Sequence, residues 1–307
     1  MRIINPKTIS SIAIFTVILV VAVFFLFSAP GDFPPGKVVR IEKGLSLSQI
    51  AGELKSAGIV RFGWPLAFIV KILNKEKNAQ FGDYVFESPI SAFGVAKKII
   101  GGDSGIEKTK VIVPEGSTLK DIAEIFNLFE NFNKDNFLTA TKNMEGYFFP
   151  DTYFFSPYAD ASEIIAEMKD NFKNKVGNID PKVVVMASLI EKEAANKSDR
   201  RIISGILWKR LNVGMPLQVD AIFPYIIGKK SSELTLEDLK IDSPYNTYLY
   251  KGLPPFPIAN PGLDAIEAAL NPAESFYFYY LADKEGNTHY AVSFDEHKIN
   301  KRKYLLN

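Results

Sequence analysis

The feature that most constrains this chain is an uncharged apolar run near its N-terminus. No charged residue occurs between Lys7 and Asp32, and the segment from Ile9 to Ala29 consists mostly of Ile, Val, Phe, Leu and Ala. As an α-helix, these roughly 21 residues would measure about 30 Å, which matches the hydrocarbon core of a lipid bilayer. The sequence therefore predicts a single N-terminal transmembrane helix.

A cleaved signal peptide is the alternative interpretation of the same run. The apolar part of such a peptide is usually only about 7–15 residues long, and the residues around Ala29 make a poor cleavage site. Arg2 and Lys7 precede the run, whereas Asp32 is the first charge after it. Because positive charge is retained in the cytoplasm, we expect a cytoplasmic N-terminus and residues 32–307 on the other side of the membrane.

Composition excludes several kinds of protein. The chain of 307 residues has no cysteine and two histidines, so disulfide frameworks, thiolate catalysis and the usual zinc sites are excluded. Its formal net charge is +1, which argues against binding to nucleic-acid phosphates. We therefore expect no metal, no cofactor and no nucleic-acid partner.

Two stretches of the chain resemble each other, at residues 38–54 and 110–126. Each begins with alternating apolar residues, turns at a glycine, and continues with a Ser or Thr before apolar residues at helical spacing. This pattern predicts a strand, a turn and a capped helix. The repeat is either a recurrent structural unit or a carbohydrate-binding module.

The rest of the chain has clear start and stop signals. Asp180-Pro181 is a strong signal for a helix start, and Ser198 is expected to cap the next helix, which Gly214 ends. The segment 242–262 holds five prolines and is expected to form an ordered loop. The predicted helices cover 160–175, 182–196, 198–214 and 263–270, and a β-hairpin is predicted over 276–282 and 288–294.

Two glutamates end the apolar helix that begins at Pro181. Residues two apart on a helix point about 200° away from each other, so Glu191 and Glu193 cannot act as a facing pair. At least one of them is expected to be partly buried, and burial raises a carboxyl pKa toward the range that a general acid needs. The alternative is an ion pair with Lys192, Arg200 or Arg201.

Aromatic and polar residues cluster in a way that suits sugars, which have apolar faces and polar edges. The clusters lie at 147–155 and 245–250, and their alternative role is core packing. Gln218 and Asp220 stand in an otherwise apolar stretch, so they are either buried in a polar network or face a cleft.

Five segments together resemble one family. They are EGYFFPDTY (145–153), ASLIEKEA (187–194), RL-x-x-GM-x-LQ-x-D (210–220), SPYNTY-x-x-x-GLPP-x-PI-x-NPG (243–262) and the closing stretch 277–297. In this order they resemble the YceG-like, or MltG-type, endolytic murein transglycosylases. The resemblance implies an α+β fold with a transmembrane helix (1–31), a small LysM-like βα module (32–108) and a larger mixed α/β catalytic domain (109–307).

The resemblance also implies an activity. The family cleaves the bond between N-acetylmuramic acid and N-acetylglucosamine in nascent peptidoglycan, as a lyase that uses no water. It implies that Glu191 protonates the leaving oxygen and then acts as base while the 6-hydroxyl of the muramic acid attacks the anomeric carbon. The products would carry 1,6-anhydro ends, and glycan strand elongation would stop.

The remaining site residues are implied in the same way. Glu145 and Asp151 would order the surrounding loop, and the substrate-binding residues would be Gln218, Asp220, Tyr245, Asn246, Tyr248 and Glu145. The chain departs from the family pattern at Lys209, Val219, Ala221, Ile222 and Phe256. These departures affect the contacts expected between the site and the sugars of the substrate.

Two alternatives stay open. One is a water-using muramidase with Asp220 or Asp151 as a second carboxylate, and the other is a glycan-binding scaffold of the elongation machinery. In each case we expect peptidoglycan strands and penicillin-binding synthases as partners at the bacterial cytoplasmic membrane.

Overall fold

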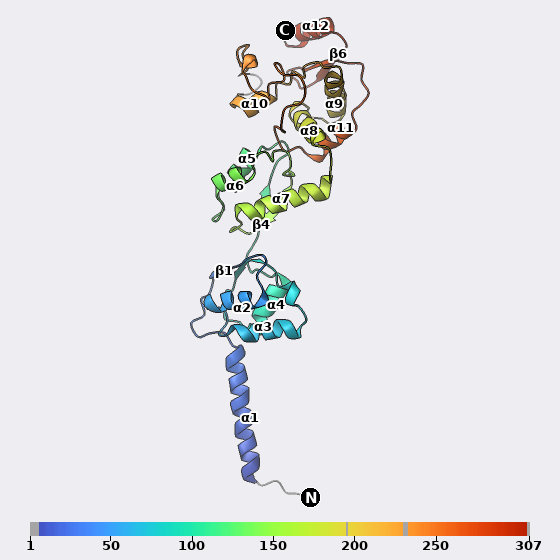
Figure 1. Ribbon diagram of the computed structural model, residues 1–307. Helices are drawn as coiled ribbons and strands as arrows, with labels where there is room; N and C mark the ends of the chain where they lie inside the picture. The colour runs from blue at the N-terminus through green and yellow to red at the C-terminus, as the bar shows by residue number, and fades with distance from the viewer. Residues whose placement is uncertain (1–5, 195, 230–232, 306–307) are drawn as a thin grey trace. The chain divides into compact units, whose positions relative to one another are not determined.

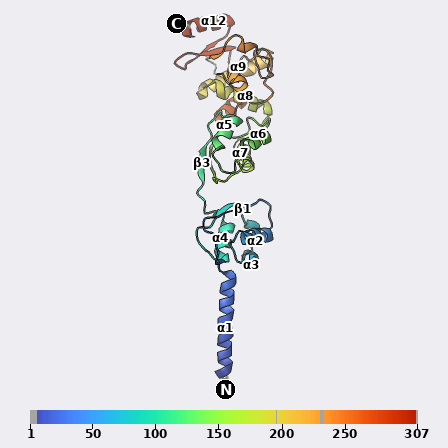
Figure 2. The same ribbon diagram turned by 90° about the vertical axis from the view of Figure 1, so that its left-hand side faces the viewer.

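The computed structural model describes residues 6–194, 196–229 and 233–305, with side chains from Ser11 onward except that of Lys77. The chain divides into two compact units, Met1–Lys108 and Thr109–Asn307, which Figures 1 and 2 show in two views. The described part is a mixed α/β structure with three small sheets, each made of two antiparallel strands.

The first unit starts with α1 (Pro6–Phe27) and continues with a small α/β module. Over the side chains that are described, no helix has the length and apolarity needed to cross a lipid bilayer. The module contains β1 (Val38–Ile41), α2 (Leu47–Ser56), α3 (Gly63–Ile72), the 3-10 helix η1 (Glu76–Asn78), β2 (Gly82–Val85) and α4 (Ala92–Gly101).

The module is held together by one strand pair and an apolar centre. β1 pairs antiparallel with β2, with Val39 opposite Tyr84. Ser46 caps α2 and forms a capping box with Gln49. Leu54, Leu66 and Ile99 from three helices are fully buried in the shared core. The strand, turn and capped helix that the sequence predicts over 38–54 are confirmed.

The second unit begins with a layer built on β3 (Thr109–Ile112), which pairs antiparallel with β4 (Thr152–Phe155). Between them lie α5 (Leu119–Phe126) and α6 (Lys134–Ala140), and α7 (Ala161–Val176) follows. Thr118 and Asp121 form the capping box of α5, so the second copy of the repeat is also a strand, turn and capped helix. Phe126, Phe137 and Phe148 fill the core of this layer.

The rest of the second unit is mainly helical. It contains α8 (Pro181–Glu193), α9 (Lys197–Asn212), α10 (Ile222–Ile227), the 3-10 helix η3 (Asp238–Lys240), α11 (Leu263–Leu270), the hairpin of β5 (Tyr279–Ala282) and β6 (Thr288–Ala291), and α12 (Phe294–Leu305). α8 packs against α9 and α11, and α12 packs against the hairpin (Figure 1). Seven consecutive residues of α8, from Val184 to Ile190, are buried.

The sequence predictions for this region are confirmed in most respects. Asp180 caps α8, the α7 and α11 helices form, and the hairpin forms with shorter strands than expected. The start of α9 was predicted wrongly. Asn196, rather than Ser198, is its N-cap, because the Asn196 carboxamide accepts the backbone N–H of Asp199. α12 was not predicted.

Candidate active site

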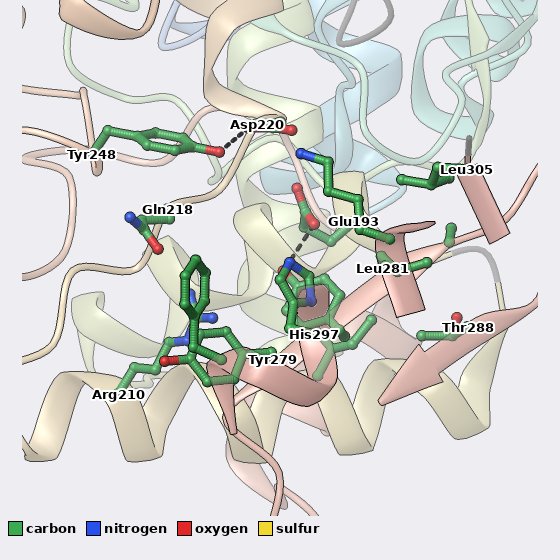
Figure 3. Close-up of a pocket in the computed structure, with 15 residues that line it drawn as sticks. Glu193, Arg210, Gln218, Asp220, Tyr248, Tyr279, Leu281, Thr288, His297 and Leu305 are labelled. Atoms are coloured by element: carbon green, nitrogen blue, oxygen red, sulfur yellow. Dashed lines mark hydrogen bonds between the residues drawn. The ribbon is translucent and has the colours of Figure 1, made fainter. Parts of the chain in front are cut away.

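A cavity of about 340 Å³ opens where α8 ends (Figure 3). Glu193 lines it together with residues from α9, the loop after α9, the hairpin and α12. We call it the Glu193 cavity. Its other polar and aromatic lining residues are Arg210, Gln218, Asp220, Tyr248, Tyr279, Tyr280, Thr288, Phe294, His297 and Lys301.

The fold places Glu193 at this point for a local reason. α8 runs through the core of the unit, and Glu193 is its last residue, so the carboxylate emerges where the buried helix ends. Glu193 Oε2 accepts a hydrogen bond from the Tyr280 hydroxyl at 2.8 Å, and Oε1 accepts one from the backbone N–H of Ala221 at 3.3 Å. Both partners fix the direction of the carboxylate.

The surroundings of Glu193 favour its protonated form. Burial raises the pKa of Glu193 to about 6, and the negative charge of Asp220 acts in the same direction, while the hydrogen bond from Tyr280 lowers it. A carboxyl group with a pKa near 6 can give and take a proton close to neutral pH. This property is what a general acid in a glycan-cleaving site requires.

Asp220 and Gln218 reach the cavity from the loop after α9. The Tyr248 hydroxyl donates a hydrogen bond to Asp220, as the dashed line in Figure 3 shows. Gln218 has a positive φ of 53°, a conformation that is uncommon outside glycine and that recurs at functional sites. Its backbone N–H donates to the Thr247 carbonyl at 3.2 Å, which ties the two loops of the cavity together.

Glu191 lies in a different environment. Its side chain is 5% exposed, and it is absent from the described lining of the Glu193 cavity. Oε1 accepts from Arg200 at 2.7 Å, and Oε2 accepts from the backbone N–H of Gly262 at 2.9 Å. Burial raises the pKa of Glu191, while the Gly262 bond and the Arg200 charge lower it. Glu191 therefore joins α8 to α9 and to the start of α11.

The two glutamates thus diverge as the helical geometry predicts, and burial raises the pKa of each. The ion pair with Arg200 involves Glu191, and the cavity-facing carboxyl is Glu193. The expectation that Glu191 contacts substrate stays a prediction, and in this structure both of its oxygens are bonded inside the protein.

Two other expected substrate-binding residues have structural partners. Asn246 is fully buried and donates to the carbonyls of Leu239 and Ile241. Tyr245 packs against Tyr225 with ring centroids 5.3 Å apart. Neither belongs to the described lining of the Glu193 cavity, whereas Gln218, Asp220 and Tyr248 do.

Glu145 also lies in the interior. It is 6% exposed, and its Oε1 accepts from the backbone N–H of Leu119 and from the Asn260 carboxamide, each at 2.9 Å. Asn260 in turn accepts from the N–H groups of Gly146 and Phe148. Burial raises the pKa of Glu145 to about 7. Through Asn260, Glu145 therefore holds in place the loop that contains Gly146 and Phe148. It lies outside the described lining of the Glu193 cavity.

Several residues that line the Glu193 cavity were not predicted from the sequence. Arg210 is buried and donates to the carbonyls of Leu217 and Phe278, so it connects two walls of the cavity. His297 and Lys301 belong to α12, and the buried Nδ1 of His297 has no partner among the described residues. One signal was available: Ser293 and Glu296 form reciprocal bonds at the start of α12, the pattern of a capping box.

Comparison with known families decides where the chain belongs. A model of the YceG-like family matches residues 39–303. The chain belongs to the YceG-like family. The match includes both units from β1 to α12 and contains every residue of the Glu193 cavity except Leu305.

Curated YceG-like relatives and a solved structure support the assignment. The endolytic murein transglycosylase of Bacillus subtilis (strain 168) is 32% identical over 307 residues, covering 87% of this chain and 84% of the relative. The protein of the same name from Streptococcus pneumoniae serotype 2 is 29% identical over 320 residues, covering 87% of this chain and 58% of the relative. A crystal structure of a putative YceG-like protein from Listeria monocytogenes has a TM-score of 0.54 at 30% identity, covering 86% of this chain and 98% of that chain.

Proposed function

We propose that this YceG-like protein is a lytic transglycosylase that cleaves peptidoglycan glycan strands internally. The relatives in B. subtilis and S. pneumoniae are named endolytic murein transglycosylases. The observation that carries the proposal is the half-buried carboxyl group of Glu193, which lines a polar cavity and whose pKa burial raises to about 6. No metal or cofactor is part of the proposed reaction.

The first step is protonation of the leaving oxygen. At pH 7 a carboxyl group with a pKa near 6 is protonated in roughly a tenth of the molecules. In this form Glu193 gives its proton to the glycosidic oxygen between N-acetylmuramic acid and N-acetylglucosamine, and the bond to the anomeric carbon breaks. Tyr280 and the Ala221 N–H then stabilise the carboxylate that is left, through bonds of 2.8 Å and 3.3 Å.

The second step closes the product ring. The 6-hydroxyl of the muramic acid attacks its own anomeric carbon, and the Glu193 carboxylate takes the hydroxyl proton, which restores the acid. No water enters, and the new end is a 1,6-anhydro sugar. Because the nucleophile belongs to the same sugar, a second carboxylate for activating water is unnecessary.

We assign the acid to Glu193 rather than to Glu191 for a physical reason. Protonating Glu191 would weaken its 2.7 Å ion pair with the buried Arg200 guanidinium and leave that cation with the half-exposed Glu115 carboxylate at 4.0 Å, which is unfavourable in the interior. Glu193 has no cationic partner within salt-bridge distance among the described residues. The pKa of each glutamate is raised, but of the two it is Glu193 that lines the cavity.

A water-using muramidase is the second candidate, and Asp220 is the observation that favours it. Asp220 lines the same cavity and influences the pKa of Glu193, so it has the position of a second carboxylate. Two carboxyl groups at a glycosidic bond are typical of hydrolases. The glycan-binding scaffold is the third possibility.

Mass spectrometry of the products separates these functions. The full chain in detergent is incubated with purified glycan strands, and the new ends are weighed. We expect internal cuts whose muramic acid ends are one water lighter than reducing ends. Ends of full reducing mass would contradict the proposal in favour of hydrolysis, and binding without cleavage would favour the scaffold.

We also propose that the protein acts at the cytoplasmic membrane. The uncharged run from Ile9 to Ala29 supports a single-pass anchor in the cytoplasmic membrane, with the second unit outside the cytoplasm. The strand–helix–helix–strand order of β1, α2, α3 and β2 supports a LysM-like module. Penicillin-binding synthases are the expected partners, since they produce the strands at the membrane surface.

Anchoring is tested by washing membranes from expressing cells at alkaline pH. The chain should stay in the membrane pellet, and protease added from outside should digest it. Release into the wash would contradict the anchor while leaving the catalytic proposal intact.

A further inference from the structure

The outer face of α3 carries a stripe of large apolar side chains. Trp64, Phe68 and Ile72 lie four residues apart, so they share one side of the helix. They are 56%, 49% and 62% exposed. Single exposed apolar residues are ordinary, but a continuous stripe with two aromatic rings usually marks a contact surface. We call these three residues the α3 stripe.

The opposite face of α3 already makes the contacts that the fold needs. Leu66 and Val70 are fully buried in the core of the module, and Ile69 is nearly so. The α3 stripe is therefore not required for packing inside the module. Trp64 and Phe68 also line a groove of about 820 Å³ along α2 and α3, together with Leu47, Gly52 and Lys71.

The stripe continues the apolar surface of α1. The Trp64 ring contacts the ring of Phe27, the last residue of α1, with centroids 6.3 Å apart. Arg61, just before α3, places its guanidinium 4.0 Å from the centre of the Phe25 ring and donates to the Ala29 carbonyl. Figures 1 and 2 both show α3 on the side of the module where α1 ends.

The apolar and basic residues around the α3 stripe indicate the kind of surface that it contacts. The described side chains of α1 expose large apolar groups along its length, from Ile12 to Phe25. Basic side chains accompany the stripe: Arg61 at its start, and the exposed Lys71 and Lys75 toward its end. Tryptophan and basic residues beside an apolar helix are typical of the boundary between lipid headgroups and acyl chains.

We propose that α3 lies on the surface of the bilayer, with the α3 stripe inserted at the level of the lipid headgroups. Lys71 and Lys75 then meet anionic headgroups, which attract such residues. This inference rests on the proposed anchor, because α1 brings α3 to the membrane. Its consequence is that the module is fixed at the membrane surface at two points, α1 and α3, rather than tethered by α1 alone.

The absence of cysteine makes a direct test possible. Single variants Phe68→Cys and Ile72→Cys carry a nitroxide spin label on the full chain, in nanodiscs of phosphatidylcholine with one quarter phosphatidylglycerol. Lys97→Cys, at an exposed position of α4, is the matched control. We expect labels at 68 and 72 to collide several-fold more often with oxygen than with a water-soluble nickel chelate, and the label at 97 to show the reverse.

A label at Val17, on the exposed surface of α1, separates failure of the stripe from failure of the anchor. Lipid exposure at 17 with water exposure at 68 and 72 overturns the inference and leaves the anchor standing. Water exposure at all four positions overturns both. Water exposure at 17 with lipid exposure at 68 and 72 overturns the anchor and the attachment at two points, and leaves only the docking of α3 on the lipid surface.

Tryptophan fluorescence gives a second measurement that needs no label on α3. Trp64 is one of two tryptophans, so Trp208→Phe leaves it as the single tryptophan. Lipids brominated near the headgroup should quench Trp64 strongly, and they should leave Trp208 unquenched in the Trp64→Phe chain. Equal quenching of the two would overturn the inference.

Discussion

The Tyr280 hydroxyl donates a 2.8 Å hydrogen bond to Oε2 of Glu193, so a strand of the C-terminal hairpin orients the carboxyl group that ends α8. The two residues are far apart in the sequence and meet at one wall of the Glu193 cavity. The bond stabilises the charged form of Glu193 and thereby lowers its pKa against the larger effect of burial.

Replacing Tyr280 by Phe should raise the pKa of Glu193, because the charged carboxylate loses a donor. A general acid acts in its protonated form, so the rate falls as pH rises through its pKa. The alkaline limb of kcat/KM should therefore move upward by about 0.5–1 pH unit. Tyr277→Phe, on the same segment but without a bond to Glu193, is the control, and an unshifted limb in Tyr280→Phe would contradict the prediction.

Replacing Asp220 by Asn should have the opposite effect. The Asp220 charge raises the pKa of Glu193, so its removal lowers that pKa and moves the alkaline limb downward, by up to about one pH unit. The asparagine still accepts the bond from Tyr248, which preserves the loop. A pH–rate profile measures the limb separately from any change in KM. A shift in the same direction as for Tyr280→Phe would be inconsistent with this electrostatic account.

Glu145 should make the second unit less stable as pH rises. Its folded pKa of about 7 lies above the ordinary value of 4.5, so the folded state binds the proton more tightly than the unfolded state. This contribution is fully present below about pH 4.5 and is lost as pH rises to about 7, a change of about 3 kcal/mol.

The matched variant is Glu145→Gln, whose side-chain oxygen can still accept from Leu119 and Asn260. Urea unfolding of both chains at several pH values gives the free energy of unfolding. The difference between them should change by about 2.5 kcal/mol in favour of the variant between pH 5 and pH 8. Parallel curves would show that Glu145 has an ordinary pKa.

Gly205 allows α9 to pass close to the segment after α11. A Cβ atom at this position would overlap the backbone carbonyl oxygen of Ala273, and a backbone atom cannot move aside cheaply. Gly205→Ala should therefore destabilise the second unit by about 3 kcal/mol or more.

Gly52 on α2 is the contrasting position, because no heavy atom lies within 4 Å of a Cβ there. Gly52→Ala should stabilise the module by about 0.5–1 kcal/mol, since alanine favours the helix. Thermal unfolding checks both variants. Equal effects of the two substitutions would argue against the close approach at Gly205.

Local signals in the sequence predicted much of the fold. Asp180-Pro181 marked the start of α8, and the spacing of Glu191 and Glu193 predicted that they diverge. The sequence did not show which of them faces a cavity, because that depends on Arg200, Gly262 and Tyr280, which only the folded chain brings to α8. The resemblance implied that Glu191 is the acid, and we propose Glu193 because it lines the cavity.

The loops were the harder part. Asn246 and Tyr245 belong to a segment rich in groups that suit sugars, yet Asn246 satisfies buried carbonyls and Tyr245 packs on Tyr225. A polar side chain in a loop can serve the fold or the ligand, and the sequence pattern is the same in both cases. The helix α12 was not predicted, although Ser293 and Glu296 form a capping pattern at its start. Its sequence has no apolar residues repeating at helical spacing, and none of its residues is buried.

The most direct test of the account compares Glu193→Gln with Glu191→Gln on purified glycan strands. Circular dichroism first confirms that both variants are folded. We predict that Glu193→Gln lowers the cleavage rate at least about 100-fold while strand binding persists, since it removes the proton donor. Glu191→Gln should lose stability but keep the rate within about one order of magnitude. Normal cleavage by Glu193→Gln, or abolished cleavage by a folded Glu191→Gln, would contradict the assignment of Glu193 as the acid.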